Sequence, residues 1–190
     1  SIGTSVTNNT IDGGLNGVVV SGGNNTLVSG NTITDITDTN PSRIDSDFQK
    51  GVAILSNNGA TNVTISDNTI TDGSDGVRVD LAGMGNIVSN NDISGMRKEG
   101  IIVKSTSGTQ VSDNTLRDNK KGVQVYDATN TVVDNNVMTN TESASVIVTK
   151  GSIGTSVTNN TIDGGLNGVV VSGGNNTLVS GNTITDITDT

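Results

Sequence analysis

The sequence predicts an all-β solenoid in which short coils stack and pair their strands in parallel. With one exception, an asparagine recurs every 22 to 24 residues in a similar apolar motif, and periods of roughly 20–50 residues indicate repeat architectures. Each repeat holds three short runs of Val, Ile and Thr separated by Gly, Asn, Asp and Ser, which is strand and turn chemistry. With only two aromatic residues and 31% hydrophobic residues, the core has to be narrow. We expect about eight coils, about 4.8 Å apart.

The first part of each repeat centres on an asparagine, as in V-S-N-N-D-I at 88–93 and V-S-D-N-T-L at 111–116. Asparagine tolerates a left-handed backbone, and its amide both donates and accepts hydrogen bonds. We therefore expect the shared asparagine to form the bend itself and to bond to its equivalents above and below, as an internal ladder. The predicted ladder is Asn9, Asn31, Asn68, Asn91, Asn114, Asn136, Asn160 and Asn182.

The second part of each repeat is a G-V-x-V strand, found at 17–20, 51–54, 76–79, 100–103, 122–125, 145–148 (without its glycine) and 168–171. Strand alternation predicts that both valines point inward and that the residues between and after them point outward. The predicted outward row is Val19 and Ser21, Ala53 and Leu55, Arg78 and Asp80, Ile102 and Lys104, Gln124 and Tyr126, Ile147 and Thr149, then Val170 and Ser172. Charge and the only tyrosine thus gather on three adjacent coils.

Residues 1–39 and 152–190 are identical, letter for letter. The duplication indicates a recent tandem copy, an engineered extension, or a window on an array with a period of 151 residues. Each alternative requires that the same segment fits two places in one stack, which is a property of solenoids. We therefore expect residues 1–190 to form one β-helix. Its open strand edges also predict end-to-end self-association.

One ladder interval, of 37 residues, places an inserted loop at 34–50. The loop holds the only proline and the only phenylalanine, Phe48. Because it ends just before a G-V-x-V strand, we expect it to overhang that sheet, with Phe48 covering apolar surface. Asp45 and Asp47 are weak candidate calcium ligands, and no other cofactor is expected.

Composition excludes several functions. The absence of histidine and cysteine removes histidine triads, thiol nucleophiles and ordinary zinc or copper sites. The net charge of −9 argues against nucleic acid as a partner. No apolar run approaches the roughly 20 residues of a membrane span. The acidic Ser/Thr/Asn/Gly surface favours an extracellular or cell-surface location.

The V-S-x-N-x-I motif followed by G-V-x-V resembles the right-handed parallel β-helix repeats of the pectin lyase-like superfamily, most of all those of mannuronan epimerase-like proteins. The resemblance covers nearly the whole chain but is carried by structural positions. It implies a right-handed parallel β-helix and polysaccharide binding on the sheet of the G-V-x-V strands. The Y-G-F-D-P-H motif of the epimerases and the calcium nonapeptide G-G-x-G-x-D are both missing, so the resemblance implies a fold rather than an activity.

On the G-V-x-V face, the candidate polysaccharide-binding residues are Arg78, Asp80, Lys104, Gln124 and Tyr126. An acidic sugar chain laid along the stack would meet two cations and one ring. For β-elimination or epimerisation, Lys104 or Tyr126 is the candidate base. The alternative is a solvated face with ion pairs across strands.

Two function classes follow. The first is a rigid extracellular structural or adhesive segment that stacks or continues end to end, and the second is a carbohydrate-active lyase or epimerase. Three weaker alternatives also arise: type I′ hairpins at the Asn-Gly pairs, a T-x-T ice-binding face interrupted by Asp12 and Arg117, and a G-M-G phosphate loop at 83–85, which we interpret as a turn.

Overall fold

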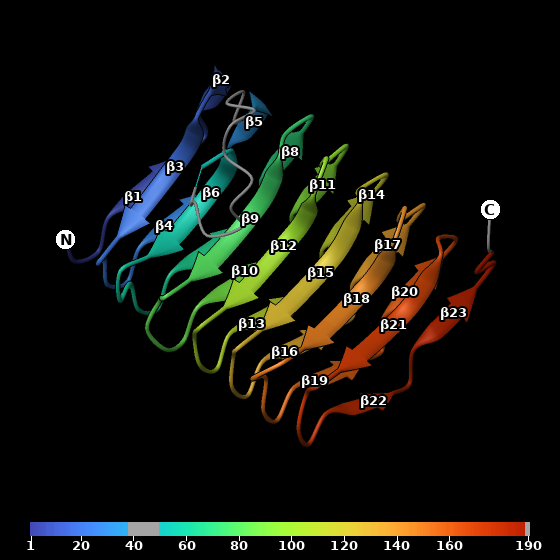
Figure 1. Cartoon of the computed structure of the whole chain (residues 1–190). Coiled ribbons are helices and arrows are strands. Elements are labelled where there is room, and N and C mark those ends of the chain that lie inside the picture. The colour runs from blue at the N-terminus through green and yellow to red at the C-terminus, as the bar shows by residue number, and fades with distance from the viewer. Residues whose placement is uncertain (38–49, 189–190) are drawn as a thin grey trace.

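The chain is described by a computed structural model that covers residues 1–37 and 50–188. It winds into a solenoid whose strands form three parallel sheets, and the coils follow one another in chain order (Figure 1). Every strand pair in this part of the chain is parallel, so the hairpin alternative is wrong. Among the described residues, no helix is long and apolar enough to cross a membrane.

Two of the sheets are built from short strands. The first sheet is β1 (Ser5–Thr7), β4 (Leu27–Ser29), β7 (Thr64–Ser66), β10 (Ile87–Ser89), β13 (Gln110–Ser112), β16 (Val132–Asp134), β19 (Ser156–Thr158) and β22 (Leu178–Ser180). The second sheet is β2 (Thr10–Gly14), β5 (Thr32–Ile36), β8 (Thr69–Thr71), β11 (Asp92–Ser94), β14 (Thr115–Arg117), β17 (Val137–Thr139), β20 (Thr161–Asp163) and β23 (Thr183–Thr185).

The third sheet, which we call the long-strand sheet, has strands of six residues. It is β3 (Asn16–Ser21), β6 (Val52–Asn57), β9 (Asp75–Asp80), β12 (Glu99–Lys104), β15 (Lys121–Tyr126), β18 (Ala144–Thr149) and β21 (Asn167–Ser172). Each of the first two sheets has eight strands and the long-strand sheet has seven, within 1–37 and 50–188. Seven coils are therefore complete in this part of the chain.

The core is a narrow column of small branched residues. In one coil, Val88 of β10, Ile93 of β11, and Ile101 and Val103 of β12 all point inward and are fully buried. A short strand has room for one inward side chain, whereas a long strand supplies two. This layout confirms the narrow core predicted from composition, because four Val or Ile side chains fill such a coil without aromatic rings.

The asparagine ladder is confirmed over all eight predicted residues. The Nδ2 of each asparagine donates to Oδ1 of the next at 2.9–3.0 Å. Its backbone N donates to the same oxygen at 2.9–3.1 Å. Asn91 shows the full pattern, since its Nδ2 also donates to the Ile65 and Ser89 carbonyls, each at 3.0 Å.

The ladder asparagine does not form the bend itself, contrary to the sequence prediction. The left-handed residue is the one before it, for example Gly30 (φ 67°), Asn90 (φ 55°) and Asp113 (φ 58°). Two different residues therefore form the bend and the ladder. The left-handed residue lies at the outer corner, exposed to solvent, whereas the ladder amide has to point into the coil.

The position of the strand around residue 53 also differs from the prediction. Val52 pairs with Asp75, and Ile54 with Val77, so Ala53 takes the place that Gly76 has in the next coil. A Cβ at Gly76 would lie 2.4 Å from the Gly100 carbonyl oxygen, which restricts this column to small residues. Ala53 is therefore a buried core residue and not an outward one.

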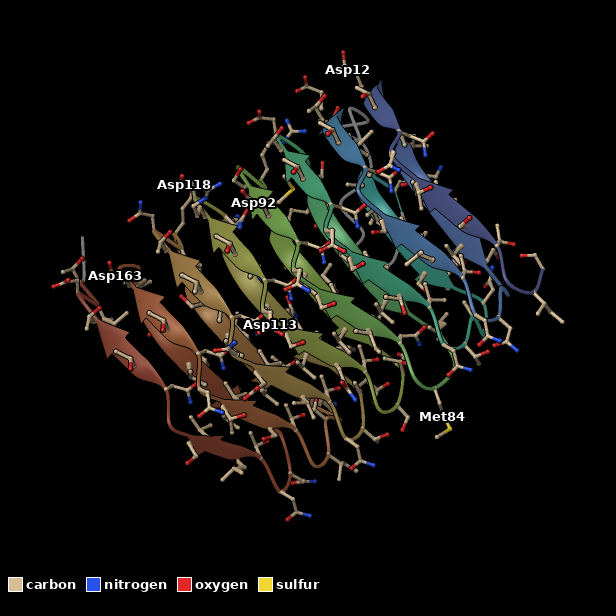
Figure 2. All side chains as sticks on the ribbon, turned by 180° about the vertical axis from the view of Figure 1, so that it is seen from behind. Asp12, Met84, Asp92, Asp113, Asp118 and Asp163 are labelled. Atoms are coloured by element: carbon tan, nitrogen blue, oxygen red, sulfur yellow. The ribbon has the colours of Figure 1, made fainter. Side chains whose placement is uncertain are left out.

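Three other sequence predictions are settled or bounded by the structure. The G-M-G segment is a bend between β9 and β10 and no helix follows it, so it is not a phosphate loop. The threonine rows of the second sheet are interrupted by Asp12 and by an Arg117–Asp92 ion pair of 2.7 Å, and Figure 2 shows Asp12 and Asp92 pointing away from the ribbon. Most of the inserted loop, with Asp45, Asp47 and Phe48, lies outside the described residues.

We expect Asn91→Ala to lower the free energy of unfolding by about 1–3 kcal/mol, because it removes the oxygen that accepts from the Asn68 backbone N and Nδ2 and the amide that donates to the Ile65 carbonyl. The matched control is Asn90→Gly, since Gly30 holds the same left-handed position in its own coil, and it should change stability by less than about 1 kcal/mol. Urea denaturation measures both. Equal effects of the two substitutions would contradict the ladder as the dominant interaction at this corner.

Candidate functional site

Charged and polar side chains gather on the outward face of the long-strand sheet, over β9, β12 and β15. They lie in three rows across the strands, which we call the polar face. The rows are Asp75, Glu99 and Lys121; Arg78, Ile102 and Gln124; and Asp80, Lys104 and Tyr126. The last two rows contain all five predicted site residues in the predicted order, with Lys104 between Asp80 and Tyr126.

Arg78 and Asp80 form a buried ion pair. The Arg78 Nε and Nη2 donate to Asp80 Oδ2 at 3.0 and 2.7 Å, and the two side chains are only 5% and 3% exposed. For this pair the expectation of a solvated face with ion pairs across strands is wrong, because the pair is buried and is formed within one strand. Elsewhere on the same face, Lys121 and Glu99 do form an ion pair across strands. Arg78 lies in register between Leu55 and Ile102, both buried, so apolar neighbours flank its guanidinium.

Lys104 and Tyr126 form the more accessible part of the polar face. The Lys104 Nζ lies 5.8 Å from the centroid of the Tyr126 ring, within the range of a cation–π contact. Tyr126 is 39% exposed and Lys104 is half-buried. This edge of the face therefore offers a ring and a cation side by side.

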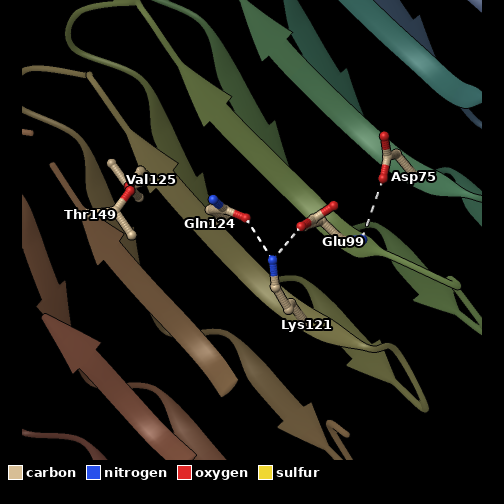
Figure 3. A network of polar contacts seen from close by, with 6 residues as sticks. All are labelled: Asp75, Glu99, Lys121, Gln124, Val125 and Thr149. Carbon is tan, nitrogen blue, oxygen red and sulfur yellow. Dashed lines mark hydrogen bonds and ion pairs between the residues drawn. The ribbon is translucent and has the colours of Figure 1, made fainter. Parts of the chain in front are cut away.

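The row of Asp75, Glu99 and Lys121 was missed by the sequence analysis (Figure 3). Lys121 Nζ lies 2.7 Å from Glu99 Oε1 and 3.3 Å from Gln124 Oε1, and the Glu99 backbone N donates to Asp75 Oδ1 at 3.4 Å. A signal was present in the sequence. The residue before the glycine of G-V-x-V is acidic, acidic and basic in three successive repeats.

Asp75 keeps its proton to a much higher pH than an ordinary aspartate. Burial, the largest cause, and the Glu99 carboxylate together raise the pKa of its carboxyl to about 7, against the opposing effect of the Lys98 ammonium. The row therefore places an acid that titrates near neutral pH beside a carboxylate that is paired with a lysine. Asp75 is only 2% exposed, so this acid supports the face and does not reach a ligand on it.

The groups that a ligand can reach are Lys104, Lys121, Gln124 and Tyr126. Together they supply two cations, an amide and a ring over two adjacent strands, which suits binding by charge-assisted hydrogen bonds and stacking. No cluster of three or more acidic side chains that could hold a metal ion lies within residues 1–37 and 50–188.

We expect Asp75→Asn to stabilise the protein at pH 8 relative to the parent, by about 1–3 kcal/mol. The folded-state pKa of about 7 lies above the ordinary value of 3.8. Stability from the protonated carboxyl is thus fully present below about pH 4 and is lost as pH rises to about 7. At pH 4 the two proteins should be close in stability.

Thermal unfolding between pH 4 and pH 9 measures this difference. Asp113→Asn, which removes an exposed carboxyl from the corner after β13, is the control for the loss of one negative charge. If Asp75→Asn loses the same stability at every pH, Asp75 is ionised in the folded protein and its proposed state is wrong.

Solved structures show the same fold at low sequence identity. A glycoside hydrolase is 14% identical with a TM-score of 0.68, and the alignment covers 96% of this chain and 38% of that one. The surface protein and adhesin PfbA of Streptococcus pneumoniae is 14% identical with a TM-score of 0.65, covering 98% and 65%. The A-module of the mannuronan C-5 epimerase AlgE6 of Azotobacter vinelandii is 17% identical with a TM-score of 0.53, covering 94% and 58%.

These likenesses establish the fold alone, and this chain spans less than two thirds of each of those three proteins. Among curated protein sequences, none matches the chain. The family described as "Right handed beta helix region" matches residues 1–162, which is most of the sequence. The resemblance to pectin lyase-like β-helices is thereby confirmed at the level of fold. The chain belongs to the right-handed β-helix family.

Proposed function

We propose that the chain is a rigid extracellular structural or adhesive segment whose coils continue from end to end. The observation that carries the proposal is the identical pair of segments, 1–39 and 152–190. The first opens the stack and the second is its last part, yet the strands of the long-strand sheet have equivalent bounds in both, Asn16–Ser21 and Asn167–Ser172. One sequence thus forms the same coil at both ends, as an array of repeating units requires.

The interior of the stack supports a rigid rod. Each coil is joined to its neighbours by three parallel strands and, at one corner, by the asparagine ladder. The chain has no histidine or cysteine for catalysis. A pneumococcal surface adhesin has a similar solenoid, which supports an adhesive role on a cell surface.

The rod predicts that the array can be lengthened. Adding residues 40–190 again after Thr190 continues the sequence with its period of 151 residues, or six ladder steps. We expect the maximum dimension in small-angle X-ray scattering to rise by about 29 Å, at about 4.8 Å per coil. We also expect one cooperative unfolding transition with a midpoint no lower than that of the parent.

A matched control joins the same unit through a flexible Gly/Ser linker of about 20 residues, which interrupts the stack. This protein should behave as two independent units. If the directly fused protein behaves like the linker control, the coils do not continue and the rod proposal fails.

The second candidate function is binding of an acidic polysaccharide on the polar face, with Arg78, Asp80, Lys104, Gln124 and Tyr126 as the site. The observation that favours it is the exposed Tyr126 ring beside the Lys104 ammonium. In this proposal the two lysines of the face meet sugar carboxylates and a sugar ring packs on Tyr126. The Arg78–Asp80 pair is buried beside these groups and does not itself reach a ligand. Structures of the same fold include a glycoside hydrolase and a mannuronan epimerase, which supports this choice of ligand.

We expect Tyr126→Ala and Lys104→Ala each to weaken binding of alginate or polygalacturonate oligomers about tenfold, the equivalent of about 1.4 kcal/mol. Isothermal titration measures affinity, and absorbance of unsaturated products tests whether Lys104 or Tyr126 acts as a base in elimination. Lys120→Ala is the matched control, because Lys120 is an exposed lysine that lies just before β15 and outside the three rows. Equal affinity of all four proteins, or no binding by the parent, removes the site.

A further inference from the structure

The two accessible lysines of the polar face lie at opposite ends of its strands. Lys104 is the last residue of β12 and pairs with Tyr126, whereas Lys121 is the first residue of β15 and pairs with Glu99. Five residue steps along the strands separate the two rows, which is a span of about 17 Å. A ligand that meets both lysines therefore has to extend along the strands.

A ligand laid along the stack would meet only one of these lysines. On one side of Lys104, the charged groups of β9 are buried, including the guanidinium of Arg78. On the other side, the outward residues of β18 and β21 carry no charge. These residues are Ile147, Thr149, Val170 and Ser172. The accessible charge of this face therefore follows the strands and not the stack.

The Lys121 ammonium is fixed in place and can still accept a ligand. Its Nζ lies 2.7 Å from Glu99 Oε1 and 3.3 Å from Gln124 Oε1 (Figure 3). An ammonium has three N–H groups, and the described residues accept only two of them. The Lys121 side chain is 28% exposed and that of Glu99 is 13% exposed. Of this pair, the lysine is therefore the partner that a ligand reaches more readily.

Gln124 lies between the two ends of this path. It is half-buried on β15, and its neighbour in register on β12 is the buried Ile102. Its Oε1 accepts from Lys121, which leaves the amide N–H groups to donate to a sugar hydroxyl. Strand β15 therefore presents a cation, an amide and a ring in order, and the Lys104 ammonium lies beside the ring.

From these observations we infer that the polar face selects an acidic oligosaccharide that lies along β12 and β15. One sugar carboxylate binds Lys121, and the other end of the ligand binds Lys104 and Tyr126. Lys121 determines specificity for length, because a uronic acid dimer is shorter than the span between the lysines and a tetramer is long enough to cross it. Glu99 is a positioning residue for Lys121. This inference rests on the second proposed function and names the direction and minimum length of its ligand.

Oligogalacturonates of two and four residues test the length. In NMR titrations of the parent, we expect the tetramer to bind about tenfold more tightly than the dimer. Lys121→Met should remove this gain and leave the affinity for the dimer unchanged, whereas Lys121→Arg should keep most of the gain because it keeps the charge. Lys120→Ala, which removes an exposed lysine just outside the polar face, is the control and should change neither affinity.

A double variant separates loss of the contact from a change in charge. Lys121→Met leaves the Glu99 carboxylate without its partner, and this charge repels an acidic ligand. Glu99→Gln combined with Lys121→Met removes both charges, and it also covers the case in which the unpaired carboxylate disturbs the fold. We expect the double variant to lack the length gain as well. Recovery of the gain would overturn the inference, because the single variant would then act by repulsion alone.

Added carboxylates test the direction. Gln124→Glu places a negative charge on the path along β15, and Ser172→Asp places one at an exposed position two strands further along the stack. We expect Gln124→Glu to weaken binding of the tetramer about tenfold and Ser172→Asp to leave it unchanged. The opposite result places the ligand along the stack and overturns the inference.

These outcomes distinguish the inference from the proposed site. Equal affinity of the parent for dimer and tetramer, or equal effects of Lys120→Ala and Lys121→Met, overturns the inference. In both cases the site at Lys104 and Tyr126 stands if Tyr126→Ala still weakens binding of the dimer. If the parent binds neither oligomer, the proposed site fails and the inference fails with it.

Discussion

Each coil has to repeat the backbone path of the coil beneath it, and the rest of the structure depends on this constraint. Parallel pairing in three sheets places equivalent residues in columns, so a corner needs a left-handed residue in every coil. The column after the second-sheet strand shows the result, with Asp72, Gly95 and Asp118 at φ of 57°, 72° and 54°. The asparagines, aspartates and glycines at these left-handed corners follow from this demand. Leu81 and Ser105 are exceptions, at φ of 52° and 49°.

The outward side chains are not restricted in this way, so their charge and polarity can differ from coil to coil. On the inner side, the columns consist mainly of Val and Ile, with Leu116 and Met138 following Ile93 in one of them, because every side chain has to pack on the next coil about 4.8 Å away. On the polar face, successive coils carry aspartate, glutamate and lysine in one row. The face therefore combines a buried support, Arg78 with Asp80, and an accessible edge, Lys104 with Tyr126. A solenoid can thus change its ligand without changing its core.

The stacking that buries the interior coils also explains why the end coils are exposed. A coil is covered only by its neighbours in the stack, so the first and last coils each lack one of two neighbours. The identical segments make the consequence visible, since Val28 is buried and Val179 is not. Lengthening a fused array covers this edge with a further coil, because the added residues supply the next strand of each sheet.

The sequence by itself determined the fold class, the three strands of each coil and the eight ladder asparagines, because a period is local information that places residues in columns. It did not show that Asn90, rather than Asn91, is left-handed, or that Ala53 faces the core. Those outcomes depend on backbone contacts between coils. The five site residues were correctly placed on one face, but only the tertiary structure decided that Arg78 is buried and that burial raises the pKa of the Asp75 carboxyl. The burial of a side chain and the pKa of a carboxyl depend on which neighbouring side chains pack against it. The repeat pattern of the sequence does not give that information.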